Sequence, residues 1–226
     1  RLSNIGTDGY IDRASVNLSS YYLQGGYFAK NTSVKLIAFA GKEKTYHAWG
    51  YATKEEMEKF GRRYNPCGEM YTDADGNKHY YTDQTDNYLQ KNYQLLLNHS
   101  FSTAWNLNVA LHYTKGDGYY EEYKPGSSLV EYGLKPFNPD GTETNESDLV
   151  RQKKMDNKFG GGVFSLNYTG NRLTASLGGG LNQYRGNNFG KVTWVKNYIG
   201  NLSPEHEYYR NKSKKTDGNI YLKANY

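Results

Sequence analysis

Residues 92–114 alternate between apolar and polar side chains on both sides of a short turn at 102–104. Because successive side chains of a β-strand point to opposite faces, this pattern predicts a hairpin with one apolar and one polar face. The apolar face has aromatic rings at both ends and contains Tyr93, Leu95, Leu97, Phe101, Trp105, Leu107, Val109, Leu111 and Tyr113, with His99 as its single polar member. Aromatic boundaries of this kind are typical of strands that cross a membrane. We therefore expect five aliphatic residues to face lipid: Leu95, Leu97, Leu107, Val109 and Leu111.

Two further hairpins follow the same alternation, at 15–46 and at about 156–184. A seventh strand is expected from Gly218 onward. In the first strand of the 15–46 hairpin the apolar positions change face near Tyr21 and Tyr22, so the pattern defines its register only weakly.

Three long polar connections separate these hairpins, at about 47–87, 115–155 and 185–217, all at one edge of the predicted sheet. Compact soluble domains seldom contain three such connections, whereas outer-membrane barrels combine short turns on one side with long external loops on the other. Seven strands cannot close a usual barrel, and an open edge in lipid would leave backbone groups unpaired. The predicted fold is therefore all-β, with residues 1–226 forming about seven strands of a larger antiparallel transmembrane β-barrel.

The composition is compatible with this fold. The chain has 226 residues, 24 of them tyrosine. Its mean hydropathy is −0.92, and it has no apolar run long enough for a spanning helix. Barrel strands expose only alternate residues to lipid, so they also average out as polar. The net charge of +5 is spread along the chain apart from a basic cluster at 210–215, interpreted as a solvated loop because no nucleic-acid-binding motif accompanies it. The single cysteine, Cys67, permits no internal disulfide and is interpreted as a turn thiol.

The first long connection contains two local signals. Thr53 and Glu56 have the spacing of a capping box, and Gly61 follows where a short helix would end. Beyond it, the stretch YTDADGNKHYY at 71–81 predicts a small hairpin within the loop.

Asp73, Asp75 and Asn77 have the alternate spacing of a calcium-binding loop. However, Gly76 stands at the fourth position instead of the sixth, and the twelfth position is Gln84 instead of a glutamate. Turn formation is therefore the preferred interpretation.

Two other groups of residues contain the residue types of a site without its spacing. Residues 205–207 (Glu-His-Glu) and His79 lack the helical spacing of a zinc site, so no metal site is predicted. Ser100, His112 and Asn98 contain the residue types of a nucleophile and its base, but their alternation places all three on the polar face. No catalytic residue and no cofactor is predicted.

Aromatic residues gather at strand tips and in the long connections, where rings with a polar group can stack on a sugar or a planar chelate. The alternative is that they pack the loops against one another. Four are expected to face a ligand: Trp49, Tyr119, Tyr120 and Trp194.

Four stretches carry a family resemblance: RLSNIGTDGYIDRASVNLSSYYLQGGYF at 1–28, FAGKEKTYHAWGY at 39–51, RRYNPCGEMYTDADGNKHYYTDQTDNYLQKNYQLLLNHSF at 62–101 and WNLNVALHYTKGDGYYEEYK at 105–124. They resemble the barrel of TonB-dependent outer-membrane receptors of Gram-negative bacteria. The resemblance covers most of residues 1–185 and fades toward the end of the chain.

The resemblance implies a 22-stranded barrel closed by an N-terminal plug, which takes up a scarce, bulky nutrient with energy relayed by TonB through strand addition to a TonB box. Neither plug nor TonB box is found in these residues. The implied partners are TonB, a small-molecule or oligosaccharide cargo, outer-membrane lipid and a surface lipoprotein, and not nucleic acid. Iron chelates, haem, cobalamin, glycans and peptides all remain open as cargo.

Three alternatives stay open at this point. A passive outer-membrane porin would lack the plug and the TonB coupling. An outer-membrane enzyme would need Ser100 and His112 within hydrogen-bond reach of each other. A soluble carbohydrate-binding β-sandwich would bury the five aliphatic residues named above against a second sheet.

Overall fold

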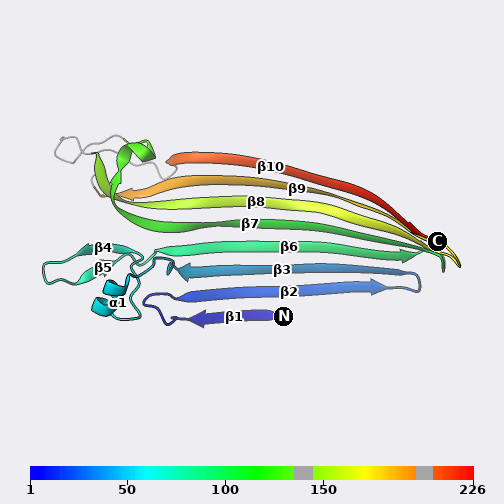
Figure 1. Cartoon of the computed structure of the whole chain (residues 1–226), viewed down its shortest axis with the longest axis horizontal. Helices are drawn as coiled ribbons and strands as arrows, with labels where there is room; N and C mark the ends of the chain where they lie inside the picture. Colours follow the sequence, from blue (N-terminus) through cyan, green and yellow to red (C-terminus); the bar gives the residue numbers. More distant parts are fainter. Residues whose placement is uncertain (135–144, 197–205) are drawn as a thin grey trace.

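The computed structural model describes residues 1–134, 145–196 and 206–226. They form one long, curved antiparallel sheet in which nearly every strand lies beside its neighbour in sequence, in the order β1-β2-β3-β6-β7-β8-β9-β10 (Figure 1). Its strands are β1 Leu2–Thr7, β2 Val16–Phe28, β3 Thr32–Tyr46, β6 Thr85–Ser100, β7 Trp105–Ser128, β8 Glu146–Thr169, β9 Thr174–Val195 and β10 Glu207–Asn225. Among the described residues β1 and β10 are each paired on one side only, so the sheet is open. The all-β prediction is confirmed, with eight strands in the large sheet instead of seven.

The predicted hairpin at 92–114 is confirmed in register. Leu95 lies opposite Leu111, and Leu97 lies opposite Val109. The adjacent strands continue the same face with further apolar residues: Leu23, Tyr27, Val34, Leu36, Phe164, Leu166, Leu177, Leu181, Ile220 and Leu222. On this face, from the level of Tyr93 down to the short turns, β2, β3 and β6 to β10 carry no charged side chain. We call this region the apolar band.

Nothing in the described part of the chain covers the apolar band. Leu36, Leu111 and Ile220 expose 60%, 47% and 75% of their surface, and none of the five residues predicted to face lipid is buried. The second sheet, β4 (Glu69–Thr72) with β5 (Lys78–Tyr80), lies beyond the strand ends (Figure 1). The burial that the sandwich alternative requires is therefore not provided within the described residues.

The opposite face of the sheet is polar and hydrogen-bonded to itself. Asn98 donates from Nδ2 to Oδ1 of Asn108 over 2.6 Å, and Asn108 donates to Oδ1 of Asn106 over 2.8 Å. Ser176 continues the network by donating to Oδ1 of Asn167 over 2.7 Å. A sheet with this arrangement separates an apolar environment on one side from a wet one on the other.

Two of the three predicted loop ranges are wrong in their bounds. The 115–155 connection is mostly strand, since β7 continues to Ser128 and β8 begins at Glu146; the 185–217 connection likewise contains the end of β9 and the start of β10, and each range includes residues outside the described part. The physical reason lies across the strands. Gly116 and Gly118 do not end β7, because both residues stay paired with β6 and β8, and the ring of Tyr88 on β6 occupies the space that their Cβ atoms would need. The range 47–87 is close to the observed 47–84.

One strand was not expected: β1 pairs with β2 from Leu2 to Thr7. The apolar residues of β2 do change face near Tyr21 and Tyr22, since Leu18 lies on the polar face and Leu23 on the apolar one, although β2 pairs with β3 in one unbroken register. Tyr22 lies on the polar face, where its hydroxyl donates to Gln24 over 2.6 Å.

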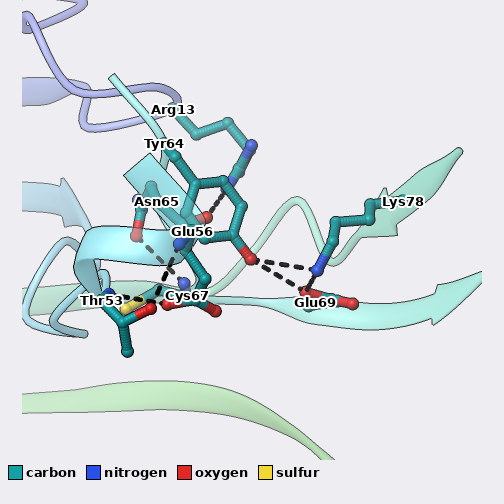
Figure 2. A network of polar contacts seen from close by, with 8 residues as sticks. All are labelled: Arg13, Thr53, Glu56, Tyr64, Asn65, Cys67, Glu69 and Lys78. Carbon is teal, nitrogen blue, oxygen red and sulfur yellow. Dashed lines mark hydrogen bonds and ion pairs between the residues drawn. The ribbon is translucent and has the colours of Figure 1, made fainter. Parts of the chain in front are cut away.

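Within the 47–84 segment both local predictions are confirmed. Helix α1 (Lys54–Phe60) begins at Thr53, whose Oγ1 accepts from the Glu56 N–H at 3.2 Å while the Glu56 carboxylate accepts from the Thr53 N–H at 2.8 Å (Figure 2). Gly61 follows the helix with φ 92°. The predicted hairpin at 71–81 corresponds to β4 and β5. None of the described helices is long and apolar enough to cross a membrane.

A buried amide holds this segment to the sheet. Asn65 is 1% exposed, and its Nδ2 donates to the carbonyls of Asp12 at 3.0 Å and His47 at 2.9 Å, while its Oδ1 accepts from the Cys67 N–H at 3.0 Å. Arg13 donates to the Asn65 carbonyl (Figure 2). One side chain thus ties together the β1–β2 connection, the end of β3 and the turn before β4.

A small hydrophobic core lies over β8 and β9, at the end of the sheet where the long connections are. The 3-10 helix η1 (Leu129–Tyr132) packs its Leu129 and Tyr132 against Leu149 and Val192. Arg151, on the same face, donates to Glu122 over 2.7 Å and to the Tyr132 hydroxyl over 3.0 Å. The 3-10 helix η1 is therefore folded onto the polar face of the sheet.

Candidate functional site

The start of the 47–84 segment and β7 bring three rings together beyond the apolar band. His47 stacks on Trp49 with ring centroids 3.8 Å apart, and Tyr120 contacts Trp49 edge-on at 5.6 Å. Trp49 is 51% exposed, whereas His47 is 2% exposed. Burial lowers the pKa of His47, so its ring is neutral near pH 7. Two of the four predicted ligand-facing aromatics thus form one platform with an open tryptophan face.

A concavity of about 490 Å³ lies beside this platform on the polar face. Tyr88 and Tyr120 contribute rings, Lys153 contributes a cation, and Asp86 contributes a carboxylate. The Lys153 Nζ lies 5.7 Å from the centroid of the Tyr120 ring. The mixture of rings, hydroxyls and both charge signs suits a polar, ring-containing ligand that needs both stacking and hydrogen bonds.

The other two predicted aromatics lie on the opposite face. Tyr119 occupies an odd-numbered position of β7, and the odd-numbered positions of this strand lie on the face of the apolar band. The Lys154 Nζ lies 4.6 Å from the centroid of the Tyr119 ring. Trp194 stacks with Tyr123 at 6.2 Å, and Tyr123 in turn lies 6.0 Å from Tyr81. Consecutive residues of a strand cannot share a face, so Tyr119 is separated from Tyr120.

The Trp194 cluster is held by hydrogen bonds to carboxylates. The Tyr81 hydroxyl donates to Glu121 over 2.5 Å, and the Tyr123 hydroxyl donates to Asp148 over 2.7 Å. Burial, followed by these hydrogen bonds, raises the pKa of both tyrosines. Because both hydroxyls are already engaged, this cluster acts as a brace between the 47–84 segment and the sheet.

The predicted site residues do not include His47, Tyr88, Lys153 and Asp86. The alternation of β7 contains a signal for two of them, because its continuation past Gly116 places Tyr120 opposite Asp86 on one side and Lys153 on the other. The predicted connection at 115–155 excludes that continuation.

Residues 73–77 form a hydrogen-bonded turn, as the preferred interpretation of their sequence predicts. The Asp73 carboxylate accepts from the N–H groups of Asp75 at 3.1 Å and Asn77 at 2.8 Å, and from His79 Nε2 at 2.9 Å. These hydrogen bonds, the one from His79 foremost, lower the pKa of Asp73 to about 2. Within the described ranges no group of three acidic, histidine or cysteine residues could hold a metal ion. Glu205 of the other metal candidate lies outside those ranges.

The serine and histidine of the enzyme alternative are not neighbours. Ser100 lies opposite Asn106, whereas His112 lies opposite Gln94. Six strand positions therefore separate the two side chains, about 20 Å along the strand. His112 is engaged with the Oδ1 of Asn182 at 2.8 Å. Cys67, predicted as a turn thiol, is buried, and its Sγ accepts from the Gly50 N–H at 3.2 Å.

No protein-family model matches this chain, and no curated protein matches it. The resemblance to TonB-dependent receptors therefore stays a prediction.

Proposed function

We propose that this chain forms part of the wall of a transmembrane β-barrel, and that the barrel is a TonB-dependent outer-membrane receptor that imports a scarce, bulky nutrient. The observation that carries the proposal is the uncovered apolar band, whose reverse face is a hydrogen-bonded polar surface. Apolar surface of this extent is unfavourable in water and favourable against hydrocarbon. The polar face then lines the lumen.

The height of the band supports a lipid environment. Along β7 it extends from Trp105 to Tyr113, aromatic residues that are 43% and 42% exposed. Eight steps of about 3.4 Å make about 27 Å along the strand. With a tilt of about 40°, the band is about 21 Å tall, close to the value of about 25 Å for outer-membrane barrels.

The open edges of the sheet fit a larger barrel. In lipid, the outer edges of β1 and β10 would leave backbone N–H and C=O groups without partners. In the proposal both edges pair with further strands of the same barrel, whose 22 strands are implied by the resemblance.

Cargo is proposed to bind at the platform of His47, Trp49 and Tyr120, beside the 490 Å³ concavity. The platform lies beyond the aromatic end of the apolar band and on the lumen side, so a ligand arriving from outside would meet it before entering the barrel. Trp194 lies on the outward face and is left out of the proposed site. The Tyr119 side chain also follows the outward face, but the residue is among those that line the concavity.

Membrane insertion is tested by spin labelling of the full-length natural protein. Val109→Cys and Ala110→Cys, each in a Cys67→Ser background, place labels on adjacent residues of opposite faces. In phosphatidylcholine vesicles the label at 109 should be relaxed by oxygen and shielded from a water-soluble nickel chelate. The label at 110 should be far less accessible to oxygen. Equal oxygen accessibility at both positions would reject the proposed lipid face.

Transport is tested by growth on haem, cobalamin, a ferric chelate or a glycan, each offered as the only supply. One of these should support growth only when both the receptor and TonB are present. Tyr120→Ala should then raise the concentration needed for half-maximal growth about 3- to 10-fold, the value of one stacking contact. Tyr71→Ala, which removes an exposed ring that does not line the concavity, should not. Uptake that continues without TonB would favour the passive porin instead.

A further inference from the structure

Five cations lie side by side in one cross-strand row, immediately beyond the apolar band. The register places them directly opposite one another on five consecutive strands, β6 to β10: Lys91, Lys115, Lys158, Arg185 and Lys214. All five lie on the face of the apolar band, because each is an even number of positions from a residue of that band on its own strand. We call this set the cation row.

The cation row is unfavourable without an anion. Like charges directly opposite each other in a sheet repel and destabilise it. Among the described residues Lys91, Lys158 and Lys214 have no ion-pair partner, and Arg185 donates to the neutral Gln183. Lys115 reaches one carboxylate, that of Asp117, at 4.0 Å.

The charges next to the row do not neutralise it. On the loop side, the adjacent level of the same face carries two carboxylates, Asp117 and Asp156, and two lysines, Lys42 and Lys212. These four charges cancel, so the two levels together keep the full positive charge of the row. On the other side lies the level of Tyr93 and its neighbours, which is uncharged.

The position of the row indicates what can compensate it. It lies two residues, about 7 Å, beyond the aromatic end of the apolar band. In the proposed membrane orientation this is the level of the lipid headgroups on the side of the long connections, which is the outer leaflet. Five strands spaced about 4.8 Å apart make the row about 19 Å wide, enough to reach more than one phosphate.

We infer that the cation row binds the phosphate groups of lipid A, the phosphorylated glycolipid of the Gram-negative outer leaflet. Lysine ammonium groups on flexible stems suit phosphates whose position varies, and the apolar band directly below accepts the acyl chains of the same molecule. This inference rests on the proposed membrane function, because the row meets a headgroup only if the band lies in lipid.

In the test, full-length protein is reconstituted in phosphatidylcholine vesicles with and without bis-phosphorylated lipid A. The amount of lipid A retained per protein is then measured after mild detergent extraction. The variant is Lys115→Gln with Lys158→Gln. The matched control is Lys35→Gln with Lys223→Gln, which removes the same charge from the polar face. Each cation near a charged membrane contributes about fivefold in affinity, so the variant should bind about 25-fold more weakly and the control should bind as the natural protein does.

Two further arms separate the possible results. Dephosphorylated lipid A should bind to the natural protein no more tightly than bis-phosphorylated lipid A binds to the variant. Inorganic phosphate should not displace the bound lipid. Equal retention by all three proteins, or full retention of dephosphorylated lipid A, would overturn the inference. Displacement of the lipid by inorganic phosphate would also overturn it, since the row would then be a simple anion site. If the protein inserts into vesicles but gives one of these overturning results, the lipid A inference fails and the proposed membrane function still stands. If the protein does not insert, both the inference and the proposed function fail.

Discussion

Replacing Asn65 by alanine is expected to release the 47–84 segment from the sheet while the sheet itself stays paired. The amide is 1% exposed and makes three hydrogen bonds, to the carbonyls of Asp12 and His47 and from the N–H of Cys67. Alanine can make none of them. The groups left behind are backbone groups at the junction, and two of them, on His47 and Cys67, lie in buried surroundings.

The size of the effect follows from these contacts. A net hydrogen bond contributes about 1 kcal/mol, and a buried group left without a partner costs about 1–3 kcal/mol. One partly exposed contact and two buried ones therefore amount to about 3–5 kcal/mol. Since about 1.4 kcal/mol corresponds to a factor of ten, the population of the open segment should rise by at least about 100-fold.

Hydrogen exchange of the full-length protein measures this opening directly. The reporters are the Asp12 N–H, bonded to the Arg63 carbonyl at 2.8 Å, and the His47 N–H, bonded to the Gln84 carbonyl at 2.8 Å. Both keep their own partners in Asn65→Ala, so faster exchange reports undocking. Asn77→Ala, an exposed amide in the same segment, should change the rates less than about fivefold. Acceleration below about tenfold in Asn65→Ala, or acceleration equal to that of the control, would refute the reasoning.

Two other predictions concern the same end of the molecule. Gly118→Ala should lower the free energy of unfolding by about 1–3 kcal/mol, because the added Cβ would overlap the Asn87 carbonyl oxygen. The control is Gly25→Ala, where no atom lies within 4 Å of the added Cβ. Equal stability of the two variants in denaturant unfolding would contradict the observed register. Because burial lowers the pKa of His47, the undocked chain binds more protons, and stability should fall as the pH drops below about 6.5. Protease resistance of the 47–84 segment should accordingly decline on acidification in the natural protein but not in His47→Gln, and an identical decline in both would reject this assignment.

The parts of the fold that could be predicted are those whose signal is local or periodic. The capping box at Thr53 and Glu56 requires only a spacing of three, and it is formed as expected. The alternation of Leu95 and Leu97 fixes the face of β6, because a slip of one residue would reverse it. His99, the single polar residue expected on the apolar face, is accommodated by the Thr32 hydroxyl 2.7 Å away on β3.

The parts that could not be predicted depend on partners distant in sequence. Beyond the apolar band the strands carry charge and tyrosine on both faces, so no hydrophobic period marks them, and only pairing across strands keeps them extended. The Tyr88 ring over Gly116 and Gly118 is one such case. For the candidate site, the aromatic content of the loops was a usable signal, but the separation of Tyr119 from Tyr120 follows only once β7 is known to continue through them.

The unbroken run of β7 and β8 from the short turns to the loop end has a mechanical consequence. Their backbone ladder continues from the level of Trp105 and Tyr168 up to that of Lys124 and Leu149, without a flexible joint at the boundary of the apolar band. A force applied at the upper rim would load these hydrogen bonds in parallel shear, the direction in which a ladder is stiffest. We therefore expect the rim to move as one piece with the wall below it, and any opening or closing at this end to come from elements outside this ladder, such as the 47–84 segment.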